Sequence, residues 1–247
     1  MIQNVRISGV PDVPDEIVLS NDPRLGQWSA YYEDSFGGSN PDWSCNGQEI
    51  RGALHRVEGA PAESDGTGWR ESLLRYHRPV FEDGVISYEF FYSPGETLTH
   101  PALDRLAFLL TPDGVKLHWV TDGTHDRTRL SPTNVFAAPE QRRGPEMLPL
   151  KPEDWNRLEL HLTGDVVTLV LNDVEVFSRT LELENQRTFG LFHYADQSAV
   201  RVRNVVWRGD WPRGIPSLQE QELATPDHDF LAMSDEHLAA RFEHDFS

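Results

Sequence analysis

The sequence is poor in cysteine and has no long apolar run, and each shortage excludes a class of protein. Cys45 is the only cysteine among 247 residues, so no internal disulfide can form, and we expect this side chain to act as a small buried apolar residue. No apolar run approaches the length of a membrane span, which predicts a chain without membrane insertion. Residues 1–16 also lack the basic run and apolar core of a secretory signal.

Positive charge is also scarce. The chain has 22 Lys and Arg residues against 40 Asp and Glu residues, and its formal net charge is -18. Nucleic-acid binding requires clustered cations that displace counterions from phosphates, so this balance predicts no nucleic-acid partner. Lys116 and Lys151 are the only lysines. The preference for Arg reflects either genome composition or a salt-tolerant acidic surface, and the sequence leaves both open.

The common catalytic motifs are missing. The paired carboxylates of jelly-roll glucanases, the His-Glu-x-x-His and Gly-x-Ser-x-Gly motifs, a phosphate-binding Gly-Lys loop and an EF-hand loop do not occur. His118, Asp122 and His125 have compact spacing, but a strand end followed by a glycine turn explains it equally well. We therefore predict no metal and no cofactor, and we leave the catalytic residues unassigned.

What the sequence does contain is a strong β pattern between Trp155 and Trp211. Apolar and polar residues alternate from Leu158 to Leu162, and turn signals at Thr163–Asp165 and at Asn172-Asp173 flank the next apolar run, Val166–Leu171. Together with 38% hydrophobic and 10% aromatic residues, this pattern predicts an ordered all-β protein. We expect a two-sheet antiparallel jelly-roll sandwich with a short helical C-terminal tail.

The domain limits follow from the same pattern. We expect a leading segment at residues 1–27, one sandwich domain at 28–213, and a tail or linker at 214–247 that leads toward a further domain. In the tail, Ser234 followed by acidic residues before Leu238 and Phe242 predicts a short capped helix.

The middle of the chain predicts four more strands in a meander, followed by a long Pro-rich connection at 132–152 that crosses to the later strands. The four strands are expected at 72–77, 85–92, 105–111 and 115–121. Their alternation, with that of the later strands, predicts a core that includes Tyr88, Phe90, Phe108, Leu117, Leu158, Leu160, Phe189 and Val202.

The opposite face of these strands is polar and provides the candidate ligand-binding residues. They are His77, Glu89, Phe91, Arg105, His118 and Asp122. If the strands pair in chain order, His77, Glu89, Arg105 and His118 form one row that could bind a saccharide, with Phe91 as a stacking surface. Tyr194 is a second aromatic platform, whereas Trp119 and Trp207 are expected in the core. An ordinary solvated sheet face explains the same pattern.

Several segments resemble a bacterial family of unknown function over about residues 28–212. The segments are His100–Arg105, His118–Gly123, Leu148–Leu150, Asn185–Tyr194 and Val202–Val205. More distantly, Trp155, Asn156, Leu171–Asp173 and Arg203-Asn204 are similar to the keto-glycoside hydrolase and lyase family and to concanavalin A-like jelly rolls. The resemblance implies a two-sheet sandwich with flanking domains, within a larger bacterial protein that is exported.

Two functions are compatible with these residues. The first is a non-catalytic carbohydrate-binding or adhesion module with a glycan ligand. The second is an enzyme acting on a modified keto sugar, with Glu89 or Asp122 as general base and His77 or His118 as proton partner. A purely structural spacer is a third possibility. An enzyme requires a pocket where a carboxylate and a histidine meet, whereas a binding module can use a shallow face.

Overall fold

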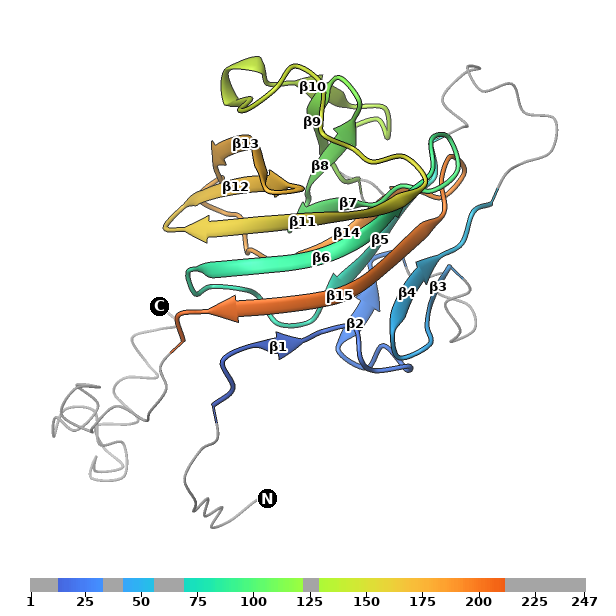
Figure 1. Cartoon of the computed structure of the whole chain (residues 1–247), viewed down its shortest axis with the longest axis vertical. Helices are drawn as coiled ribbons and strands as arrows, with labels where there is room; N and C mark the ends of the chain where they lie inside the picture. The colour runs from blue at the N-terminus through green and yellow to red at the C-terminus, as the bar shows by residue number, and fades with distance from the viewer. Residues whose placement is uncertain (1–12, 33–41, 56–68, 122–128, 212–247) are drawn as a thin grey trace, which may run out of the picture. The chain divides into compact units, whose positions relative to one another are not determined.

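Two antiparallel β-sheets form a sandwich in the computed structural model, which describes residues 13–32, 42–55, 69–121 and 129–211 (Figure 1). In spatial order, sheet A contains β13 (Val174–Thr180), β12 (Val166–Leu171), β11 (Asp154–Thr163), β6 (Gly84–Tyr92), β15 (Val200–Gly209), β4 (Glu49–Gly52) and β3 (Trp43–Cys45). A short strand, β1 (Ile17–Val18), also pairs with β15. Sheet B contains β10 (Val135–Ala137), β9 (Gly114–Trp119), β8 (Leu106–Thr111), β7 (His100–Leu103), β14 (Phe189–Tyr194), β5 (Glu71–Tyr76) and β2 (Trp28–Ala30).

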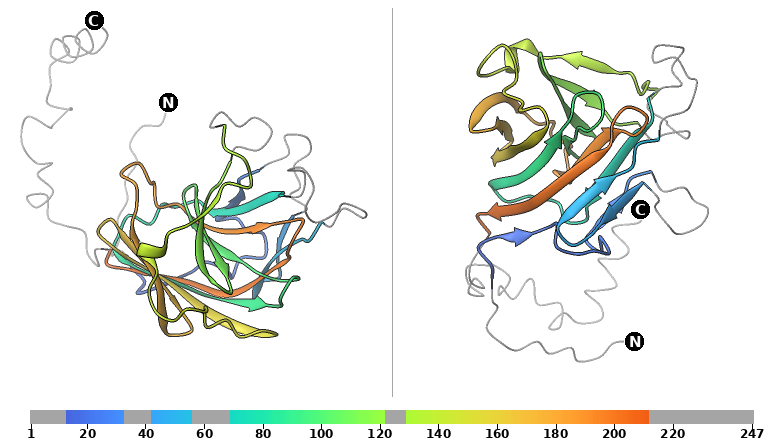
Figure 2. Two further views of the ribbon diagram at one scale, coloured as in Figure 1. Left: turned by 90° about the horizontal axis from the view of Figure 1, so that it is seen from above. Right: turned by 45° about the vertical axis from the view of Figure 1, so that its right-hand side comes forward.

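Apolar side chains from both sheets fill the space between them. All eight residues predicted for the core are buried, each no more than 1% exposed. Phe108 of sheet B packs on Phe177 of sheet A with ring centroids 5.9 Å apart, and Tyr88 of sheet A lies 6.1 Å from Phe189 of sheet B. The two layers are seen side by side in Figure 2. The predicted all-β jelly-roll sandwich is therefore confirmed.

Local turn chemistry explains the hairpins of sheet A. Asn172 and Asp173 both have positive φ, 48° and 68°, as a two-residue turn between β12 and β13 requires. Gly164, with φ of 56°, lies in the turn between β11 and β12. These turns place β11, β12 and β13 in chain order within sheet A, as the sequence predicted.

The predicted meander is wrong. β5 belongs to sheet B and β6 to sheet A, while β8 and β9 return to sheet B. The connection from His77 to Asp83 contains Pro79 and carries Val80 into the core, so it crosses between the layers instead of forming a hairpin. The chain also places β14 in sheet B and β15 in sheet A, which is the alternation between sheets typical of jelly rolls.

Asp15–Asp210 form the compact unit that contains both sheets. Among the described residues outside it, the Trp211 indole N–H donates to the carbonyl oxygen of Pro14 at 2.9 Å. β1 lies within the expected leading segment, so part of that segment contributes to sheet A. The helix expected near Ser234–Phe242 lies outside the described residues. Within the described part, the one helical element is the single 3-10 turn Pro139–Gln141, and no helix is long and apolar enough to cross a membrane.

Candidate functional site

The predicted ligand-binding residues lie on two different faces. Glu89 and Phe91 point away from the core on sheet A, whereas His118 lies on the outer face of sheet B and Arg105 lies just before β8. His77 is exposed just beyond β5, and Asp122 lies outside the described residues. The predicted single row is wrong because β5 and β6 are in opposite sheets, so these strands do not pair in chain order.

On the outer face of sheet A, Glu89 and Phe91 both contact arginines of the neighbouring strand β15. Glu89 Oε2 accepts hydrogen bonds from Arg203 Nε at 2.5 Å and from Asn204 Nδ2 at 3.2 Å. The Arg201 guanidinium lies over the Phe91 ring, 4.7 Å from its centroid. That guanidinium covers one face of the Phe91 ring. The contact with the ring therefore holds the Arg201 side chain in position.

A buried polar network occupies the outer face of sheet B. His118 Nε2 lies 2.6 Å from Glu71 Oε1, which also accepts the Thr121 backbone N–H at 3.1 Å. Glu71 Oε2 accepts hydrogen bonds from the Thr121 hydroxyl and from the Tyr32 hydroxyl, the latter at 2.8 Å. Burial would raise the pKa of Glu71, but the hydrogen bonds from His118 and Thr121 outweigh it and lower that pKa. The carboxylate is therefore ionised at neutral pH.

This network is closed to solvent. The His118 side chain is 0% exposed and the Glu71 side chain 4% exposed, and both oxygens of Glu71 are already bonded. Burial, followed by the charge of Glu71, raises the pKa of Tyr32. The network joins the start of β5 to the end of β9, so its geometry is that of a structural connection. Arg105 likewise bonds protein, through Nε and an Nη that donate to the Val120 carbonyl oxygen at 3.1 and 2.8 Å.

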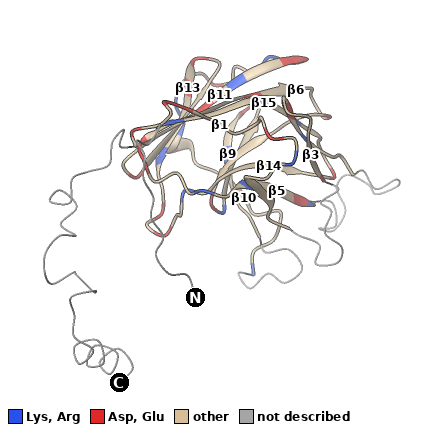
Figure 3. Cartoon of the chain, turned by 90° about the horizontal axis from the view of Figure 1, so that it is seen from below, with Lys and Arg blue, Asp and Glu red and all other residues tan. Residues whose placement is uncertain are grey.

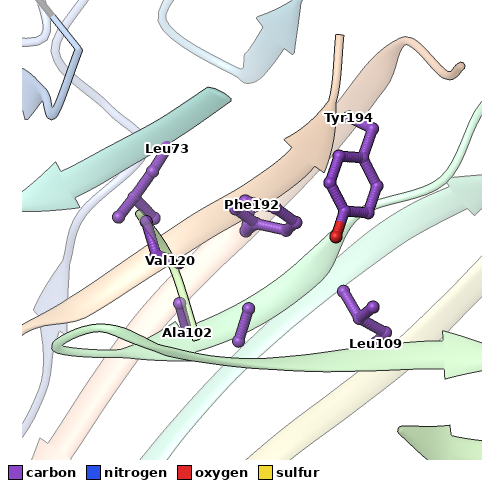
Figure 4. Packing of buried hydrophobic residues seen from close by; sticks show 7 residues of the cluster. Leu73, Ala102, Leu109, Val120, Phe192 and Tyr194 are labelled. Atoms are coloured by element: carbon purple, nitrogen blue, oxygen red, sulfur yellow. The ribbon is translucent and has the colours of Figure 1, made fainter. Parts of the chain in front are cut away.

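An apolar layer surrounds the network. The residues that form it are Leu73, Ala102, Ala107, Leu109, Val120, Phe192 and Tyr194, and they gather on one face of sheet B (Figure 4). Trp69 packs edge to face on Tyr194 at 4.8 Å, and the Tyr194 hydroxyl donates to the Pro132 carbonyl oxygen at 3.1 Å. Tyr194 is 4% exposed, so the prediction that it offers a stacking platform is wrong.

An open groove lies elsewhere, where β3 and β4 meet the start of β15. It has a volume of about 580 Å³. Its lining residues are Asp42, Ser44, Arg51, Gly52, Ala53, Leu54, Ala199, Val200 and Arg201. We refer to it as the β4–β15 groove. Small apolar residues and charged side chains therefore line the same cavity.

Gly52 has a steric role in the wall of this groove. A Cβ atom at Gly52 would lie 2.9 Å from Val200 Cβ and 3.0 Å from His193 Nε2, closer than side chains normally approach. His193 Nδ1 lies 2.6 Å from the Ser198 carbonyl oxygen, and its buried Nε2 has no hydrogen-bond partner among the described residues. Burial lowers the pKa of His193 to about 4, so the ring is neutral at pH 7.

Ion pairs organise the charges of the groove. Glu49 accepts from Arg201 Nε at 2.6 Å through Oε1 and from an Arg51 Nη at 3.1 Å through Oε2. Burial would raise the pKa of Glu49, but the bonds from the two arginines outweigh it and lower that pKa. Asp42 lies 2.6 Å from His55 Nε2 and 3.1 Å from an Arg70 Nη. Basic and acidic residues are interspersed along the strands in Figure 3.

Neither Glu71 nor the groove residues were predicted from the sequence. Glu71 lies on the same face of its strand as Arg75, because side chains alternate with a period of two, so the sequence could have placed Glu71 on the polar face. Alternation does not reveal which strand pairs with the strand of Glu71. Arg51 and Arg201 are far apart in the chain and meet only through the pairing of β4 with β15. The described residues contain no group of three or more His, Cys, Asp or Glu side chains that could hold a metal ion.

Comparison with known proteins identifies a domain family and similar folds. No curated protein matches the chain. The carbohydrate-binding module CBM66 from Bacillus subtilis is similar with a TM-score of 0.46 and 15% identity, covering 74% of this chain and 96% of that one. The Ca²⁺/Man2-bound exoplasmic/lumenal domain of VIP36 gives a TM-score of 0.48 and 10% identity, covering 83% and 91%. A native glycosidic hydrolase gives 0.45 and 13% identity, covering 85% and 100%.

Two family models match the sequence. The model described as a protein of unknown function, DUF1581, matches residues 1–43. The model described as a domain of unknown function, DUF1583_N, matches residues 66–214, which is more than half of the chain. The chain therefore belongs to the DUF1583_N family.

Proposed function

We propose that the sandwich is a non-catalytic carbohydrate-binding module whose ligand occupies the β4–β15 groove. The observation that carries this proposal is the groove itself, an open cavity of about 580 Å³ where arginine side chains stand beside an apolar wall. Pockets of about 300–1,000 Å³ accommodate small ligands. Sugars present hydroxyls on apolar carbon faces, so they require hydrogen-bond donors and acceptors beside small apolar residues.

The polar groups of the groove suit this ligand. Ser44 contributes a hydroxyl, and Arg51 and Arg201 contribute N–H donors, while Gly52 and Ala53 leave room above the wall. The site is shallow and partly solvated, so we expect modest affinity for the ligand. A catalytic site would instead require an enclosed cavity that excludes water.

The alternative is an enzyme that cleaves a modified keto sugar. It is favoured by one observation, the 2.6 Å contact between Glu71 and His118, which is the carboxylate–histidine pair that such an enzyme would use. The burial of that pair and the full use of both carboxylate oxygens argue for a structural role instead. We therefore place binding ahead of catalysis.

The second family match, at residues 1–43, includes β1 and β2 of the two sheets. We further propose that this module works beside other domains of a longer, exported bacterial protein. Binding of the module to a glycan would then hold those domains close to a polysaccharide. The sandwich itself would need no cofactor for this role.

The test is a glycan array followed by calorimetry on the best ligand, with one variant that fills the groove and one that does not. Ala53→Trp places a large ring among the lining residues, and Val170→Trp places the same ring on the outer face of β12, which is separated from β4 by three strands of sheet A. We expect Ala53→Trp to abolish binding and Val170→Trp to leave it unchanged. Equal binding by both variants would exclude the groove as the site.

A further inference from the structure

Arg51 and Arg201 face each other across two paired strands. They are direct partners in the register of β4 and β15, and both line the β4–β15 groove. Directly opposed side chains on one sheet face have Cβ atoms about 4.5–5.5 Å apart, and like charges in such pairs are destabilising. Two guanidiniums in this arrangement therefore require anions nearby.

Glu49 supplies one anion, and the pair can accommodate another. Each oxygen of the Glu49 carboxylate accepts from one arginine, so a single negative charge is shared between two positive charges. Among the described residues, the remaining N–H groups of both guanidiniums have no hydrogen-bond partner. The side chains are 56% exposed for Arg51 and 37% exposed for Arg201, so these donors are accessible to a ligand.

Aromatic contacts hold Arg201 in place before any ligand arrives. Its guanidinium lies 4.7 Å from the centroid of Phe91 and 5.2 Å from that of Trp155. A guanidinium fixed in this way loses less conformational entropy when it binds an oxyanion. Phe91 is thus a positioning residue, and the aromatic side chain predicted from the sequence acts through Arg201.

The other acid of the groove does not cancel this charge. Asp42 lies within 3.1 Å of Arg70 and within 2.6 Å of His55, so its carboxylate is already engaged by cationic or polar partners. The ionised groups Arg51, Arg201 and Arg70 outnumber Glu49 and Asp42. A locally cationic site in a chain of net charge -18 attracts small anions selectively, while the remaining surface repels long polyanions such as nucleic acids.

We propose that the β4–β15 groove binds acidic saccharides, with the carboxylate or sulfate group of the sugar held between Arg51 and Arg201. This inference rests on the proposed carbohydrate-binding function and specifies its ligand class. Arginine pairs bind planar carboxylates and sulfate oxygens through several parallel charge-assisted hydrogen bonds, which makes them selective for such groups.

Calorimetry on the full chain tests the inference with matched probes. The probes are tetrasaccharides of galacturonate, mannuronate and carrageenan, each compared with its carboxyl-reduced or desulfated counterpart. We expect at least one acidic probe to bind about tenfold or more tightly than its neutral counterpart, and binding to weaken as salt is raised from 50 to 500 mM. The acidic probe that binds most tightly shows whether the site prefers a carboxylate or a sulfate group.

Variants locate the effect. Arg51→Gln and Arg201→Gln should each weaken binding of the acidic probe by about tenfold or more. Arg157→Gln is the matched control, because Arg157 lies on the same face of sheet A but pairs with Glu159 on β11. Melting temperatures of the variants show whether each remains folded.

The outcomes separate this inference from the proposed function. Equal affinity for acidic and neutral probes, with binding lost in Ala53→Trp, would overturn the acidic-saccharide inference and leave the carbohydrate-binding function standing. Acidic selectivity that survives both Arg51→Gln and Arg201→Gln would also overturn it. Failure of every acidic and neutral probe to bind would overturn the inference and the proposed function together.

Discussion

Mild acid is expected to destabilise the sandwich through two buried neutral histidines, His100 and His193. Burial lowers the pKa of His100 to about 3 and that of His193 to about 4, from an ordinary value of 6.5. His100 Nδ1 accepts the Leu110 backbone N–H at 3.0 Å, which requires that nitrogen to be unprotonated. At pH 5 the unfolded chain protonates both rings, whereas the native state does not.

The magnitude follows from linkage. The unfolded state binds more protons between pH 6.5 and the native pKa, so the free energy of unfolding falls as the pH is lowered through that interval. From pH 6.5 to 5 the interval is about 1.5 units at about 1.4 kcal/mol each, which gives about 2 kcal/mol for each histidine. Together they should remove about 4 kcal/mol between pH 7 and 5. Glu71, whose pKa is lowered from 4.5, contributes stability that is lost only at lower pH.

Urea denaturation at pH 7, 6 and 5 measures this loss. His100→Asn retains an acceptor for the Leu110 N–H but cannot titrate, so its loss between pH 7 and 5 should be about half that of the wild type. His77→Asn, at an exposed position beyond β5, is the control and should show the wild-type loss. A wild-type loss below about 1 kcal/mol would refute the conclusion that both rings are held neutral by burial.

Three substitutions test other parts of the structure. Phe108→Ala should lower the free energy of unfolding by about 3–5 kcal/mol in chemical denaturation, because the ring is fully buried against Phe177 of the other sheet, and an effect below about 0.5 kcal/mol would contradict the packing of the two sheets. Glu71→Gln should cost about 3–5 kcal/mol by breaking the buried pair with His118 while saccharide affinity is retained, whereas lost binding or turnover at unchanged stability would indicate a site there. Gly52→Ala should cost about 1–3 kcal/mol because its Cβ would contact the opposite strand, and wild-type stability would contradict that close approach.

The sequence predicted strands and faces well because these properties are local. Alternation of apolar residues identifies which side of a strand is buried, and Asn172-Asp173 has the turn chemistry of a hairpin that the structure contains. β7 (His100–Leu103) was not predicted, and it contains Pro101, which lacks a backbone N–H and is unusual within a sheet away from its edges. In the structure Pro101 pairs with Leu191 of β14.

Strand order and the candidate site were less predictable because they depend on pairing between distant segments. The turn residues before Gly84 are compatible with a hairpin or with a crossing between the sheets. Only the structure shows that Val80 is buried and that the chain crosses here. The same limit applies to function. Phe91 was predicted as a ligand-binding residue, but its neighbour Arg201 comes from β15. The alternation of apolar and polar residues does not reveal that β15 pairs with β6.

The central claim is that saccharide binds in the β4–β15 groove, and amide chemical-shift mapping tests it most directly. The chain, labelled with ¹⁵N, would be titrated with the tightest-binding saccharide from the array. We predict the largest shift changes at Gly52, Ala53, Val200 and Arg201, which line the groove. Shift changes centred instead on the buried network of Glu71 and His118 would contradict the claim, as would the absence of any saccharide-dependent change.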